Sequence, residues 1–216
     1  MKVKLIQAQD EIILVEIARV SSSRSEDEKR DNPDQLINYL IKNNHWSPFE
    51  HTYMTLEFIT SRAIATQFLR HRSFTFQQFS LRYAEATEFE PIEIRQQAVT
   101  NRQSSEEVFD PRIERYKEFG EDCLTASGLI DVIQRNVMQA YEDLIKSGVA
   151  KEQARFILPL NTQTRLYMTG NIRSWIHMCN LRDDSHAQKE AQEIARECKK
   201  IFKSVFPITS KALGWL

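Results

Sequence analysis

Glycine is scarce in this chain, with five glycines among 216 residues and no GxG pattern. The glycine-rich fingerprints of Rossmann dinucleotide sites and of P-loops are therefore both absent. A dinucleotide bound by this protein would have to be held by side chains and by the ends of helices.

Cysteine is also rare, and the three cysteines are widely spaced and form no CxxC pair. This argues against a disulfide framework and for a reducing compartment. No segment approaches the ~20 apolar residues of a membrane helix. The N-terminal segment carries Asp10, Glu11 and Glu16 within and around its apolar part, which is not typical of a signal peptide. We therefore expect a cytoplasmic protein.

A large excess of one charge is missing as well, since the formal net charge is -1. General nucleic-acid binders and anionic-membrane binders usually carry a basic excess, so both classes are disfavoured. No compositional break divides the chain, and its length suffices for one sizeable core. We predict a single domain over residues 1–216.

Hydrophobic periodicity predicts a helix-rich α+β fold with a small mixed or antiparallel sheet. A charged loop is expected at 21–32, an extended segment at 89–99 and a flexible excursion at 103–118. Strands are predicted at 2–6, 52–59 and 162–169, and helices at 10–20, 33–41, 62–70, 129–147, 153–158, 171–181 and 185–205.

The first candidate site is the triplet Arg70-His71-Arg72, with Ser80 and Arg82 downstream. Arginine suits phosphate groups because its planar fork donates two parallel hydrogen bonds. Gln67 lies one helical turn before Arg70 and shares its face. The alternative is a solvated basic helix end, which the helix dipole favours.

Two segments fit the pattern of a helix capping box. The second candidate site is the first of these, HWSPFEH at 45–51, where Ser47 and Glu50 have the spacing of a capping box and Pro48 fits the first helical position. Ser185 and Gln188 form a second such pair. A helix start offers free N–H groups to an anion, although a well-capped helix without a ligand explains the pattern equally.

The third candidate site lies in residues 171–188. If Asn171 opens a helix, Arg173 and His177 share one face, and Arg182 follows at the helix end. The alternative is an amphipathic helix pair whose apolar residues form core.

All the histidines fall within these three segments: His45, His51, His71, His177 and His186. Their spacing matches no zinc pattern and no cysteine accompanies them, so we predict no metal site. Ser80 is in no GxSxG elbow, and the cysteines have no activating neighbours. A histidine-metal hydrolase and a nucleic-acid module using the basic triplet remain as alternatives.

Together these segments resemble the flavin-dependent thymidylate synthases. Arg70-His71-Arg72, followed by seven residues and then Ser80, is similar to the signature of that family. HWSPFEH, LPLN at 158–161 and NIR…LRDDSHAQ resemble its other landmarks in the same order. The resemblance runs from about His45 to about Phe202.

The resemblance implies reductive methylation of dUMP to dTMP. Methylenetetrahydrofolate would donate the one-carbon unit, NADPH would be the reductant, and bound FAD would be the redox cofactor. It also implies an α+β subunit in a homotetramer with active sites at subunit interfaces. The partners would be these small molecules, with no nucleic acid and no membrane.

Site residues follow from the same resemblance. Arg182 would be catalytic, facing the uracil ring and polarising it without a covalent cysteine adduct. Ligands of FAD would be Ser47, Arg70, His71, Arg72, Asn171, Arg173 and His177. Ligands of dUMP would be Gln67, Arg70, Gln78, Ser80, Arg82, Arg155 and Arg182. Gln78 stands where the family often has Glu, and His177 where it can have Asn; His45 and His186 receive no role.

Overall fold

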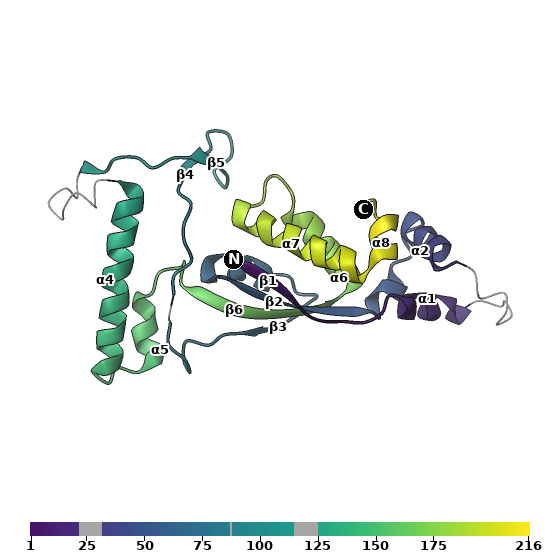
Figure 1. Ribbon diagram of the computed structural model, residues 1–216, viewed down its shortest axis with the longest axis horizontal. Helices are drawn as coiled ribbons and strands as arrows, with labels where there is room; N and C mark the ends of the chain where they lie inside the picture. The colour runs from purple at the N-terminus through teal and green to yellow at the C-terminus, as the bar shows by residue number, and fades with distance from the viewer. Residues whose placement is uncertain (22–31, 87, 115–124) are drawn as a thin grey trace. The chain divides into compact units, whose positions relative to one another are not determined.

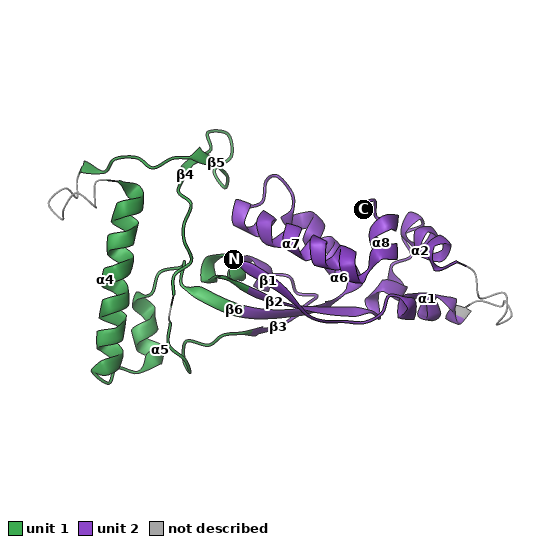
Figure 2. Ribbon diagram, in the orientation of Figure 1, with its two compact units in different colours: residues 1, 59–66, 78–165 green, residues 2–58, 67–77, 166–216 purple. Residues whose placement is uncertain are grey.

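The computed structural model describes residues 1–21, 32–86, 88–114 and 125–216. It divides into two compact units, each assembled from separate stretches of chain (Figure 2). Unit 1 comprises residues 1, 59–66 and 78–165, and unit 2 comprises residues 2–58, 67–77 and 166–216. Each unit is described by itself below.

A four-stranded sheet has the order β1-β2-β6-β3 (Figure 1). Its strands are β1 (Lys2–Ala8), β2 (Tyr53–Ser61), β6 (Gln163–Asn171) and β3 (Thr75–Gln78). The Ile172 amide bonds the Thr52 carbonyl at 2.9 Å, and the Arg62 amide bonds the Thr162 carbonyl at 3.0 Å. Rising numbers on β2 therefore meet falling numbers on β6, so this pair is antiparallel. The predicted α+β class is confirmed.

In unit 2, helix α7 packs against β1 and α6, and α8 packs against α2 and α7 (Figure 1). The helices of this unit are α1 (Ile12–Ala18), η1 (Arg19–Ser21), α2 (Pro33–Lys42), η3 (Ser47–Glu50), α6 (Ile172–Arg182), α7 (Lys189–Val205) and α8 (Pro207–Ala212). Helix α3 (Arg62–Leu69) has residues in both units. The short α8 was not predicted from the sequence.

The core of unit 2 is centred on Trp175 of α6. Its indole N–H donates to the Met54 carbonyl at 3.0 Å, which satisfies the buried donor. Its ring meets Phe74 edge-on at a centroid separation of 4.9 Å. Gly170 lies beside Phe74, and an added Cβ there would collide with the phenyl ring. The glycine is thus needed for close packing behind the candidate site.

Unit 1 contains the hairpin of β4 (Arg95–Gln97) and β5 (Ser105–Val108) and the helices α4 (Ala126–Lys146), α5 (Lys151–Ala154) and η6 (Arg155–Ile157). Its core packs Leu81, Ala86 and Ala154 against Tyr141. The Tyr141 hydroxyl accepts from the Ala86 amide at 3.3 Å. Helix α4 is followed by Gly148 at φ +85°, a left-handed conformation that glycine adopts without strain.

Three local expectations were wrong. Segment 105–108 is a strand rather than part of a flexible excursion, because backbone pairing with β4 holds it although all its side chains are exposed. Ser47–Glu50 is a 3₁₀ turn without a side-chain cap. Helix α7 begins at Lys189 rather than Ser185, and the Gln188 side chain does not cap it. The expected loop at 21–32 and residues 115–118 lie almost wholly outside the described residues.

Strand β3 was not predicted from the sequence either, and the other elements agree with the sequence to within a few residues. Asn32 caps α2, accepting from the Asp34 amide at 3.0 Å. Within the described ranges, no helix combines the length and apolar character needed to cross a bilayer.

Candidate active site

Arg182, in the last turn of α6, is the most highly connected side chain among the predicted site residues. Its Nε donates to His71 Nε2 at 3.0 Å, and its Nη2 donates to the Gln67 carbonyl at 2.7 Å. Its Nη1 lies 3.5 Å from Gln67 Oε1, a weak contact. Each terminal nitrogen therefore keeps one N–H that no hydrogen bond to a described residue of unit 2 occupies. Burial and the neighbouring Arg70 guanidinium lower the pKa of Arg182 from its usual value.

His71 is the acceptor for this arginine and is itself 8% exposed. Phe68 stacks on its ring at 6.5 Å, and Phe74 meets it edge-on at 6.2 Å. Burial, followed by the charges of Arg182 and His177, lowers the pKa of His71 to about 4. Because Arg182 can only donate, His71 Nε2 must carry a lone pair, and the hydrogen-bond network assigns the proton to Nδ1. At neutral pH His71 is therefore an uncharged acceptor at Nε2 and a donor at Nδ1.

Gln67 presents both ends of its amide to this arrangement. Its Nε2 donates to Gln188 Oε1 at 2.7 Å, while its Oε1 is turned toward Arg182. The structure thus brings together the predicted residues Gln67, His71 and Arg182 and adds Gln188, which we had interpreted only as a helix cap.

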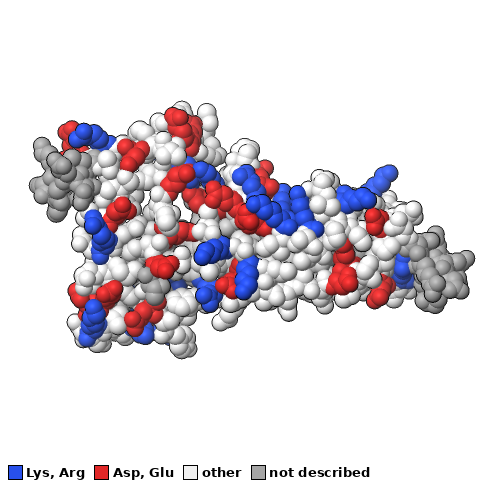
Figure 3. Space-filling model, viewed as in Figure 1, with Lys and Arg blue, Asp and Glu red and all other residues white. Residues whose placement is uncertain are grey.

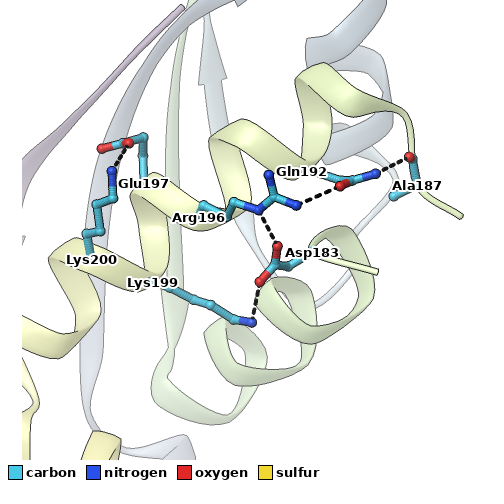
Figure 4. Close-up of polar contacts among 7 residues, drawn as sticks. All are labelled: Asp183, Ala187, Gln192, Arg196, Glu197, Lys199 and Lys200. Atoms are coloured by element: carbon cyan, nitrogen blue, oxygen red, sulfur yellow. Dashed lines mark hydrogen bonds and ion pairs between the residues drawn. The ribbon is translucent and has the colours of Figure 1, made fainter. Parts of the chain in front are cut away.

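Asp183 fastens the C-terminal end of α6 to α7 (Figure 4). Its two carboxylate oxygens accept from Arg196 Nε at 2.8 Å and from Lys199 Nζ at 2.6 Å. Burial works to raise the pKa of Asp183, but the hydrogen bonds and charges of Lys199 and Arg196 outweigh it, so the pKa is lowered. The basic side chains of α7 gather on the surface in Figure 3. These two contacts hold the C-terminal end of α6 against α7 and so fix the position of Arg182, the residue before Asp183.

The other predicted flavin residues line the N-terminal part of α6 and its neighbours in unit 2. Asn171 caps α6, since its Oδ1 accepts from the Ser174 amide at 2.8 Å. Arg173 forms an ion pair with Glu50, which explains why Glu50 does not cap its own turn. Arg173 and His177 lie on one exposed face as predicted, and Ser47, Arg70 and Arg72 are also exposed.

A second group of predicted residues lies in unit 1 and meets at Glu152. The Glu152 carboxylate is 3.5 Å from Arg82 Nε, and its backbone carbonyl accepts from Arg155 Nε at 3.2 Å. Ser80 Oγ accepts from the Arg82 amide at 3.3 Å. The predicted dUMP ligands Arg82 and Arg155 therefore share Glu152 as a contact. Gln78 donates to Thr164 Oγ1 at 3.3 Å.

Arg62 is a residue of unit 1 that sequence reasoning missed. Its Nη2 donates to the carbonyl of Phe79, directly before Ser80, at 3.0 Å. Burial and the charge of Arg155 lower its pKa from the usual value. Arg62 is the first residue of α3, and the sequence around it did not indicate this contact because its partner Phe79 lies in a loop later in the chain.

The described cysteines are not nucleophiles. Cys179 and Cys198 are free, fully buried thiols. Burial raises the pKa of Cys179 to about 12, and that of Cys198 is raised too, so neither forms a thiolate at neutral pH. Cys123 lies outside the described residues.

The histidines without an assigned role have ordinary local partners. His186 Nδ1 lies 2.7 Å from Asp184 Oδ1, and His45 meets the Tyr39 ring edge-on at 5.7 Å. In the part of the chain that the structure describes, no three His, Cys, Asp or Glu side chains form a group that could hold a metal ion.

Comparison with known proteins places these features in a family. The sequence model described as "Thymidylate synthase complementing protein" matches residues 4–208. A flavin-dependent thymidylate synthase of Synechocystis is 48% identical over 92% of this chain and 86% of its own. A probable one of Paramecium bursaria Chlorella virus 1 is 41% identical over 95% and 91%, and one of Thermosipho africanus is 35% identical over 94% and 86%.

The resemblance inferred from the motifs is thus confirmed across nearly the whole chain, which belongs to the thymidylate synthase complementing protein family, the family of the flavin-dependent thymidylate synthases.

Proposed function

We propose that this chain catalyses the reductive methylation of dUMP to dTMP with bound FAD, methylenetetrahydrofolate and NADPH. The observation that carries the proposal is the half-buried guanidinium of Arg182, held by a neutral His71 and by Gln67. The curated relatives are named flavin-dependent thymidylate synthases, which are methyl-transferring enzymes. Family membership speaks against both a metal hydrolase and a nucleic-acid module.

The donor set of unit 2 fits a flavin dinucleotide. Arg70, Arg72 and Arg173 are exposed cations suited to its phosphates, and His71 Nδ1–H can donate to a ring acceptor. Ser47, Asn171 and His177 would add further polar contacts, in keeping with a chain that has no glycine-rich loop. When bound, FAD would carry the reducing equivalents from NADPH to the new methyl group.

The task of Arg182 is to make the uracil ring electron-rich. A guanidinium at the N3/O2 edge stabilises negative charge there, as an oxyanion site does, and this raises the nucleophilicity of C5. Its two unoccupied N–H groups are available for this contact. The buried, protonated Cys179 and Cys198 favour activation by charge over covalent attack at C6.

The remaining substrate contacts would come from Gln67, Arg70, Gln78, Ser80, Arg82 and Arg155. Arg82 and Arg155 would clamp the 5′-phosphate, and the contact of both side chains with Glu152 supports this role. The neutral Gln78 would serve as a hydrogen-bonding ligand rather than a charged one.

We further propose a homotetramer with active sites at subunit interfaces, a single functional domain over 1–216, and a cytoplasmic location. Association is supported by large apolar side chains that unit 1 exposes, namely Tyr83 at 83%, Phe156 at 75% and Leu160 at 74%. The free thiols suit a reducing compartment.

Anaerobic spectroscopy of the purified protein tests the proposal. The protein should be yellow, should bleach with NADPH, and should form dTMP only when dUMP and methylenetetrahydrofolate are both present. A colourless protein that cannot be loaded with FAD, or a flavoprotein that makes no dTMP, would contradict it. Light scattering of the same sample checks the tetramer.

A further inference from the structure

We propose that Gln188 is a positioning residue for the activating arginine, acting through Gln67. The proposal rests on the function proposed above and concerns only contacts within unit 2. Gln188 Oε1 accepts from Gln67 Nε2 at 2.7 Å, while Gln67 contacts Arg182 through both its side-chain and its backbone oxygen. Gln188, Gln67, Arg182 and His71 thus form a continuous series of hydrogen bonds, here called the guanidinium relay.

The relay determines which way the Gln67 amide faces. An amide can be flipped, so that either its oxygen or its nitrogen points in a given direction. Because Arg182 can only donate, the Gln67 oxygen must face Arg182 Nη1, which leaves the Gln67 N–H to donate to an acceptor, and Gln188 Oε1 is that acceptor. With the opposite flip, two donors would face each other at Arg182. Gln188 therefore stabilises the amide orientation that the arginine requires by accepting from the Gln67 N–H.

Among the described residues, the Gln188 side chain has no hydrogen-bond partner other than Gln67. Gln188 is the N-cap residue of α7, but its side chain makes no cap hydrogen bond. The capping contact to α7 comes from its backbone carbonyl, which accepts from the Gln192 amide at 3.0 Å. A substitution at this side chain consequently leaves the helix start intact and changes the relay alone.

Two substitutions separate this role from a general structural one. Q188M removes the acceptor at nearly constant length, and Q188E keeps an acceptor that cannot donate. On the same helix, Q192M is the matched control, since Gln192 bonds the Ala187 carbonyl and Arg196 but not the relay. For each protein one measures the FAD content, melting temperature, dUMP dissociation constant and kcat for dTMP.

We expect Q188M to lose about fivefold in kcat/KM for dUMP, the effect of one neutral hydrogen bond, with unchanged FAD content and melting temperature. Q188E and Q192M should stay within about twofold of the parent protein. Full activity in Q188M, or equal losses in Q188M and Q188E, would overturn the relay. Should Q188M not fold, Q188E alone decides, because a loss there contradicts the acceptor role. If the parent protein binds FAD and makes dTMP while Q188M is unaffected, only this inference is contradicted. If the parent protein itself is inactive, the proposed function is contradicted.

Discussion

Replacing Arg182 with alanine tests the centre of the proposed mechanism. The substitution removes the donors to His71 Nε2 and to the Gln67 carbonyl, which are bonded at 3.0 Å and 2.7 Å. Arg182 itself is half-buried, so water can enter the space that its side chain leaves and replace these donors. The free energy of unfolding should therefore fall by only about 1 kcal/mol. The protein should therefore fold and retain FAD.

The catalytic loss should be far larger than the loss of stability. Removing one preorganised donor from an oxyanion-type site costs about 10²–10³-fold in kcat, or about 2.7–4 kcal/mol. Arg182 adds a full positive charge to such a donor, so we expect a decrease at or beyond the upper end of that range. Lysine should restore little, since one ammonium cannot reach His71, Gln67 and a uracil edge together.

The assay is dTMP formation under anaerobic single-turnover conditions, with flavin absorbance per protein measured on the same sample. Arg135→Ala on α4 is the control, because it removes an exposed arginine from unit 1. A decrease of less than about tenfold for Arg182→Ala, with FAD bound, would refute electrostatic activation by this residue.

Three further predictions concern stability. Asp183→Asn should lower the free energy of unfolding at pH 7 by about 1–2 kcal/mol, as charged hydrogen bonds to Lys199 and Arg196 are lost. Because the pKa of Asp183 is lowered from 3.8, its contribution should be complete above that pH and vanish as the pH falls through the lowered value; urea titrations would show this. His71 has a pKa near 4 instead of 6.5, so unfolding takes up a proton and stability should fall between pH 6.5 and 4. His71→Gln should flatten that decline, and an unchanged slope would contradict the burial argument. Gly148→Ala should cost about 1 kcal/mol in a thermal melt through backbone strain alone, since an added Cβ meets nothing within 4 Å.

Local sequence signals predicted most elements because they depend on neighbours along the chain. The Asn32-Pro33 start and the apolar spacing of α2 are of this kind, as is the end of α4 before Gly148. The strands β3 and β5 were missed. Strand β3 has only four residues, and the Ser-Glu-Glu-Val of β5 shows no apolar alternation, so pairing with β6 and β4 makes these segments strands.

The predicted caps were wrong for a different reason. Glu50 and Gln188 have side chains that can cap a helix, but both side chains bind residues that are distant in sequence instead. Glu50 binds Arg173, and Gln188 binds Gln67 across 121 positions in sequence. A capping pattern reports only what a side chain could do locally, so it cannot weigh a tertiary contact against a cap. The uncharged state of His71 was likewise unpredictable, because it depends on burial beneath the packed rings of Phe68 and Phe74.

The distribution of charge explains what such a site gains by being built from arginines. The whole chain has a net charge of -1, yet Arg182 lies near Arg70 in unit 2, and Arg62 lies near Arg155 in unit 1. Burial first, and the neighbouring guanidinium second, lower the pKa values of Arg182 and Arg62, so the charged forms of both side chains are raised in free energy. An anionic ligand relieves this repulsion, whereas a neutral analogue does not. We therefore expect each unit to favour phosphate-bearing and electron-rich ligands without the help of a glycine-rich loop.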